Sequence, residues 1–263
     1  MSFLGRRTVW QSAVTAALMI ASSVSISAQG RGAAPAGPPQ SPQVAAPIDL
    51  TGYWVALVTE DWRWRMVTPA KGDYASVPLN PEGRKVADTW DPAKDEAAGN
   101  QCKAYGAAAI MRVPTRLNIK WENENTLRID TDAGTQTRLL HFGQPQPPAG
   151  EAGWQGYSTA EWQVVGGGRG GRGAAAPPQG GSLKVVTTHM KPGYLRKNGV
   201  PYSGNAVMTE YIDRTMEPDG LSYLIVTTVV DDPQYLQQPF ITSTHYKKQP
   251  DAKGWNPTPC EAR

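Results

Sequence analysis

The sequence predicts an all-β protein: a single antiparallel barrel of about eight to ten strands, with a short helical insertion near residues 80–98. Apolar residues recur mainly with a period of two, which is typical of strands that bury one face. About ten such segments are separated by short turns, a pattern that favours a barrel or a sandwich. Closure into a barrel also removes the exposed edges that an open sheet of this size would carry.

The N-terminal residues predict an export signal. Arg6 and Arg7 form a basic start, residues 14–26 are mostly apolar, and Ala28 offers a small residue for cleavage. We therefore expect residues 1–28 to be a signal peptide and the mature protein to be periplasmic or secreted. The general secretory route is favoured, and the arginine pair leaves the twin-arginine route open.

Two further segments predict linkers. Residues 29–47 are rich in Pro, Gly and Ala and have too few large apolar groups to fold, so we expect a disordered linker before a barrel domain at residues 48–263. Residues 166–181 predict a flexible Gly/Arg/Pro-rich loop. This loop resembles an RGG segment, but it is one short copy in a chain of net charge +3, so no nucleic-acid partner is expected. No apolar run beyond the signal peptide is long enough for a membrane span.

A hairpin is the clearest element of the sequence. Residues 116–121 and 126–131 alternate apolar and polar side chains around the polar turn at residues 122–125. Pro218-Asp219-Gly220 is a second turn, in which Pro presets φ and Gly permits a positive φ. The other predicted strands are residues 52–59, 61–66, 135–142, 159–165, 183–190, 206–214, 221–230 and 239–247.

Helical signals are confined to the insertion. Asn80 followed by Pro81 predicts an N-cap and a first helical residue, opening a short helix to about Asp88. Asp91-Pro92 repeats this pattern before residues 93–98.

The two cysteines, Cys102 and Cys260, predict a disulfide in an oxidising compartment, with two free thiols as the alternative. The disulfide would tie the end of the chain back to the body of the domain.

Gly52-Tyr53-Trp54 lies at the start of the first predicted strand and resembles the opening of lipocalin-like barrels. The resemblance implies that Trp54 closes the barrel floor against a basic side chain of a late strand. Arg214 suits that structural role.

A second resemblance covers most of residues 48–260. The chain is similar to an uncharacterised family of secreted bacterial proteins, and the resemblance implies location and fold but no catalytic residue. That pattern carries His where this chain has Tyr157 and Trp where it has Phe240. The shared motifs are Pro78 to Gly83, Cys102, Gly156-Tyr157-Ser158 with Trp162, Leu183 to Thr188, Glu210 to Arg214, Asp231-Asp232-Pro233 and Cys260.

The segment at residues 61–66 predicts a ligand-binding wall. As a strand it would place Trp62, Trp64 and Met66 on one face and Arg63 and Arg65 on the other. The aromatic face suits a flat apolar ligand, and the arginines suit a carboxylate. The alternative is that the indoles fill the core and the arginines face solvent.

Glu210 is the main candidate for acid–base chemistry, because a carboxyl buried without a partner among apolar neighbours is how a general acid or base is made. The alternative is an ion pair with Arg214 or with an arginine across the sheet. His189 and His245 are candidate partners for Glu210, and with His141 they form a minimal candidate zinc set. Structural or surface histidines are the simpler interpretation.

Three functions remain open. The first is a barrel that binds a small hydrophobic or aromatic molecule. The second is an isomerase, lyase or hydrolase that uses Glu210 and a histidine, and the third is a structural or interaction module of the cell envelope. No cofactor is expected, because the chain has no phosphate loop, dinucleotide fingerprint or haem-attachment motif. The sequence does not indicate an oligomeric state.

Overall fold

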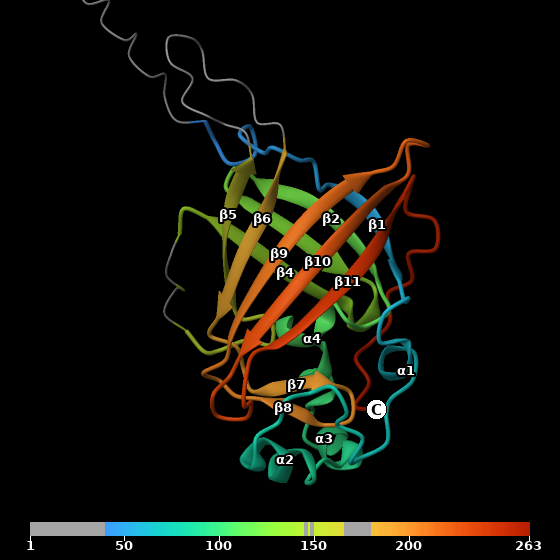
Figure 1. Ribbon diagram of the computed structural model, residues 1–263, viewed down its shortest axis with the longest axis vertical. Helices are drawn as coiled ribbons and strands as arrows, with labels where there is room; N and C mark the ends of the chain where they lie inside the picture. Colours follow the sequence, from blue (N-terminus) through green and yellow to red (C-terminus); the bar gives the residue numbers. More distant parts are fainter. Residues whose placement is uncertain (1–39, 145–146, 148–149, 166–179) are drawn as a thin grey trace, which may run out of the picture. The chain divides into compact units, whose positions relative to one another are not determined.

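Nine strands close into a barrel in the computed structural model, which describes residues 40–144, 147, 150–165 and 180–263 (Figure 1). Their order around the barrel is β1-β11-β10-β9-β6-β5-β4-β3-β2, and β2 pairs with β1 to complete the circle. The strands are β1 (Gly52–Leu57), β2 (Arg116–Asn123), β3 (Thr126–Thr131), β4 (Gln136–Phe142), β5 (Tyr157–Val165), β6 (Gly180–Thr188), β9 (Val207–Met216), β10 (Ser222–Asp231) and β11 (Phe240–Gln249). The predicted all-β barrel is confirmed.

One strand pair departs from the predicted antiparallel arrangement. β4 and β5 run parallel, with Leu140 opposite Ser158 and Phe142 opposite Ala160. Parallel neighbours need a connection long enough to carry the chain back along the sheet, and 14 residues separate the end of β4 from the start of β5 in the sequence. The barrel is therefore mixed.

The alternation that predicted the strands fills the barrel interior. Every second residue of β10, from Ser222 to Val230, is buried, and Leu117 and Ile119 of β2 face the same core. The hairpin predicted at residues 116–131 is confirmed as β2 and β3, paired antiparallel.

One end of the barrel is filled by aromatic side chains. The ring of Phe142 lies 5.6 Å from that of Trp121 and 5.5 Å from that of Trp162, between centroids. Trp162 Nε1 donates a hydrogen bond to the Pro42 carbonyl (2.9 Å), and Gln43 N donates to Glu124 O (3.2 Å). Chain contacts with the barrel therefore begin upstream of residue 48, the boundary expected from composition.

The opposite end is closed by α4 (Ala107–Ile110), whose residue Ile110 is fully buried in the barrel core. Tyr246 of β11 donates its hydroxyl to the carbonyl of Met111 (2.7 Å). Beyond α4 lies a group of short elements that we call the cap (Figure 1). The cap consists of α2 (Pro81–Ala87), α3 (Pro92–Ala97), the 3-10 helix η1 (Gln101–Tyr105) and the hairpin of β7 (Gly193–Arg196) and β8 (Val200–Tyr202).

Both helices predicted in the insertion are confirmed. Asn80 caps α2 by accepting a hydrogen bond from Gly83 N (2.8 Å), and Asp91 caps α3 by accepting one from Ala93 N (3.1 Å). The side chain of Asn80 also donates to Gln234 O (3.0 Å), which fastens α2 to the turn after β10.

The strand predicted at residues 61–66 is wrong. This segment forms the short helix α1 (Trp62–Arg65), which begins at Asp61 in a left-handed conformation (φ 51°). The β7–β8 hairpin, in turn, was not predicted. Its signal was present in Asn198-Gly199, because Gly199 takes the positive φ (82°) that tight hairpin turns require.

The disulfide between Cys102 and Cys260 is present, with a sequence separation of 158 residues. It joins η1 to the C-terminal segment. A second 3-10 turn, η2 (Ala133–Thr135), lies beside it, with Gly134 O 3.5 Å from Cys260 Sγ.

Trp54 is fully buried, and its Nε1 donates to Leu50 O (3.0 Å). The basic group over its ring is Lys248 of β11, whose Nζ lies 4.4 Å from the ring centroid, rather than Arg214. Arg214 donates instead to Ser222 Oγ (2.8 Å). Gly52 permits the Lys248 contact, because a Cβ there would lie 2.7 Å from Nζ.

Several sequence predictions lie outside the described residues. These are the signal peptide at residues 1–28, residues 29–39 of the linker, and residues 166–179 of the predicted loop. The last two residues of that loop, Gly180 and Gly181, belong to β6.

Candidate functional site

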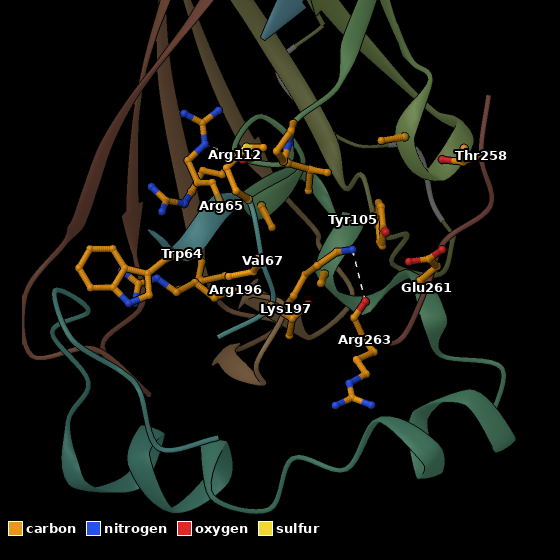
Figure 2. A pocket seen from close by; sticks show the side chains of 18 of the residues that line it. Trp64, Arg65, Val67, Tyr105, Arg112, Arg196, Lys197, Thr258, Glu261 and Arg263 are labelled. Carbon is orange, nitrogen blue, oxygen red and sulfur yellow. Dashed lines mark hydrogen bonds between the residues drawn. The ribbon is translucent and has the colours of Figure 1, made fainter. Parts of the chain in front are cut away.

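A cavity of about 420 Å³ lies at the α4 end of the barrel, between the barrel and the cap (Figure 2). Five separate stretches of the chain line it: the α1 segment, η1 with α4 and the residues just after it, Ala133 of η2, the end of β7, and the C-terminal segment. The lining residues are Trp64 to Thr68, Ala104, Tyr105, Ala109, Arg112, Val113, Pro114, Ala133, Leu195 to Lys197, Thr258, Pro259, Glu261 and Arg263.

Two buried arginines, Arg65 and Arg112, hold each other in place on one side of the cavity. Arg65 Nε donates to the carbonyl of Arg112 (2.8 Å), and its Nη1 pairs with Glu60. Arg112 Nη1 pairs with Asp61 Oδ2 (3.0 Å). Burial lowers the pKa of Arg112, and the Asp61 carboxylate opposes that effect. The left-handed backbone at Asp61 thus begins α1 and also presents a partner to Arg112.

Arg196 of β7 is the least expected group at the site. It is 3% exposed, and its Nη1 donates to Ala75 O (2.7 Å). Its guanidinium lies 4.8 Å from the centroid of the Trp64 ring and 5.9 Å from that of Phe240. Among the described residues it makes no ion pair. Burial, and secondly the charge of Arg112, lowers the pKa of Arg196 to about 10, so the group stays cationic at neutral pH.

The buried arginines carry donors that the described part of the chain does not satisfy. Arg65 Nη2, Arg112 Nη2, and both Nε and Nη2 of Arg196 are buried there without a hydrogen-bond partner. A buried polar group without a partner costs about 1–3 kcal/mol, and more when it is charged. Figure 2 shows these three arginines on the same side of the cavity as Trp64.

The facing wall is the C-terminal segment. Cys260 fixes it through the disulfide, and Thr258 accepts a hydrogen bond from Thr135 Oγ1 (2.9 Å). Lys197 Nζ donates to the main-chain oxygen of Arg263 (3.4 Å), drawn as a dashed line in Figure 2. The predicted disulfide therefore holds one side of the cavity in place.

The residues predicted as a ligand wall lie in and around this cavity, but not in the predicted arrangement. Trp64, Arg65 and Met66 line it together, whereas Trp62 is 64% exposed. Arg63 pairs with Asp73 on the surface (2.9 Å). A helix of 3.6 residues per turn mixes the two faces that a strand would separate, so Arg65 is buried and Trp62 faces outward.

Glu210 takes the alternative that the sequence left open, an arginine across the sheet. It is fully buried, and its two carboxylate oxygens accept from Arg138 Nη1 (3.1 Å) and Nη2 (2.6 Å) of β4. Neither His189 nor His245 bonds to Glu210, so the structure does not assemble the proposed acid–base pair.

The three histidines lie apart from one another. His141 stacks on Tyr157, with ring centroids 4.8 Å apart, and burial lowers the pKa of its imidazole. His189 contacts Gly150 O (3.0 Å), and His245 contacts Glu60 Oε2 (3.2 Å). Within the described residues no group of three ligating side chains could hold a metal ion, so the candidate zinc set is not brought together.

The fold and cavity define a mixed nine-stranded β-barrel with an arginine- and aromatic-lined cavity at one end. Comparison with protein-family models and with curated proteins gives no match for this chain. Among the helices of the described residues, none has the length and apolar character needed to cross a membrane.

Proposed function

We propose that this protein is an exported, lipocalin-like barrel that binds a small hydrophobic or aromatic molecule in the cavity at its α4 end. The observation that carries the proposal is the cavity itself, whose volume of about 420 Å³ falls within the range of small-molecule sites. Its walls combine apolar groups such as Trp64, Val67 and Leu195 with a few converging polar ones, which is the usual composition of such a site.

The position of the cavity differs from that of a ligand held inside a barrel. Here the barrel interior is filled by its own buried side chains, among them those of Trp54 and Tyr246. The ligand would instead lie outside the barrel end, between α4 and the C-terminal segment. The predicted export signal and the disulfide support a periplasmic or secreted location.

A neutral aromatic dye, N-phenyl-1-naphthylamine, tests this proposal. We expect saturable, blue-shifted fluorescence at one dye per chain. Val67→Asp should weaken binding at least several-fold, because it places a carboxylate in the apolar lining. Val165→Asp is the matched control, because Val165 is similarly exposed (68% against 65%) but lies on β5, away from the cavity.

Native mass spectrometry of the protein expressed to the periplasm is the companion measurement. A mass excess of a few hundred daltons, lost on denaturation, would identify a retained ligand. Absence of dye binding in the wild type, or equal loss in both valine variants, would refute the proposed site.

A further inference from the structure

The free edge of Arg196 has the shape of a carboxylate receptor. The guanidinium is anchored at Nη1 by Ala75 O, and Nε and Nη2 are left without a partner among the described residues. These two nitrogens lie side by side on one edge of the planar group, and both are closed off from solvent, so a ligand reaches them only when the side chains around them shift. A carboxylate accepts two parallel hydrogen bonds from such an edge, and this is the geometry in which arginine binds it best.

The positive charge around this edge is also not fully neutralised by carboxylates. Glu60 pairs with Arg65, Asp61 pairs with Arg112, and neither pairs with Arg196. The nearby carboxylate of Asp73 is bonded to Arg63. Within the described chain, therefore, the cluster of Arg65, Arg112 and Arg196, here called the arginine cluster, holds one buried cation more than it has carboxylates to neutralise.

Aromatic rings lie against the guanidinium groups of the arginine cluster. The Arg196 guanidinium lies over Trp64, and Phe240 lies 5.5 Å from the Arg112 guanidinium. The cavity is also lined by apolar side chains, those of Val67, Ala104 and Leu195. A molecule that joins one carboxylate to a flat or apolar skeleton would satisfy both parts at once.

We propose that the ligand of this cavity is an organic monocarboxylate with an aromatic or apolar skeleton, whose carboxylate binds the free edge of Arg196 within the arginine cluster. This inference rests on the proposed function and specifies its ligand class. The carboxylate neutralises the unmatched cation and uses donors that burial otherwise leaves unsatisfied. A neutral molecule of the same shape does neither.

A pair of probes that differ only in charge tests the inference: 1-naphthoate and its neutral analogue 1-naphthamide. Each is titrated to displace N-phenyl-1-naphthylamine at fixed pH and near-physiological salt. In the wild type we expect 1-naphthoate to bind at least about tenfold more tightly than 1-naphthamide. Arg196→Gln should abolish that preference.

Arg84→Gln is the matched control, because it removes the same charge by the same substitution at an exposed residue of α2 outside the cavity lining. It should keep the preference. If Arg196→Gln does not fold, Arg196→Lys retains the cation but lacks the two-nitrogen edge, and the preference should still fall.

The outcomes separate the two proposals. If the dye binds but both naphthalene probes displace it equally, the cavity site stands and the carboxylate assignment is wrong. An equal loss of preference in the Arg84 and Arg196 variants would attribute it to general charge and overturn the role of the arginine cluster, as would full preference in a folded Arg196→Lys variant. If the dye itself does not bind, the proposed function fails first.

Discussion

The buried ion pair between Arg138 and Glu210 offers the sharpest prediction about the barrel. Both side chains are sealed from solvent, at 1% and 0% exposure, and they share two hydrogen bonds. Removing one partner leaves an uncompensated charge in the core. Arg138→Met and Glu210→Leu should therefore each lower the free energy of unfolding by about 3–5 kcal/mol.

The double variant should behave differently from the sum of the two. Methionine and leucine together fill similar space without a charge, and replacing a whole buried pair by apolar groups is often neutral or stabilising. Arg138→Met with Glu210→Leu should recover most of the loss. The double-mutant cycle formed by the wild type, the two single variants and the double variant then gives a coupling energy of at least about 3 kcal/mol.

The assay is urea unfolding followed by tryptophan fluorescence, with all four proteins at neutral pH. Thr187 accepts a weak contact from Arg138 (3.5 Å) and bonds to Ser158 (2.8 Å), so Thr187→Val serves to measure the neighbouring polar network separately. Single variants that cost less than about 1 kcal/mol, or that add without coupling, would refute the interpretation of Glu210 as one half of a structural ion pair.

Three further predictions concern stability. Cys260→Ser should lower the melting temperature by several degrees, because chain entropy assigns about 5 kcal/mol at most to a loop closed across 158 residues; an unchanged melting temperature would contradict this. The lowered pKa of His141 means that the unfolded chain takes up protons more readily. The free energy of unfolding should therefore fall as pH drops below 6.5 towards the folded pKa, and in urea titrations His141→Phe should flatten that slope. Lys248→Met should cost about 1 kcal/mol by removing the cation over Trp54, and Lys247→Met should cost less in the same assay; equal costs would argue against the contact.

The barrel could be predicted because its signal is local. A strand with one buried face repeats every two residues; β10 shows that repeat over its full length, and β2 and β9 show it over part of theirs. Capping signals are equally local, so Asn80 and Asp91 marked the two insertion helices correctly. The parallel pairing of β4 with β5 is a property of the sheet rather than of either strand, and alternation carries no information about it.

The segment after β1 shows where local patterns fail. Six residues that alternate aromatic and charged side chains fit a strand, but they are too few to exclude a single helical turn. Contacts far along the chain decide between the two. Arg112 pairs with Asp61, and Arg65 donates to the carbonyl of Arg112, so the helix brings both groups into reach.

The candidate site was only partly predictable: Arg65 was among the residues expected to bind a ligand, but the other two buried arginines, Arg112 and Arg196, come from distant parts of the chain. Arg65 follows β1, Arg112 follows α4, and Arg196 ends β7. Each alone has the sequence signature of a surface residue, because arginine is rarely buried without a partner. The fold buries them together and leaves donors of all three unpaired within the described chain. A stable domain tolerates that cost most readily when a bound anion offsets it, which is why a binding measurement on Arg196, rather than a further stability measurement, would decide what this cavity is for.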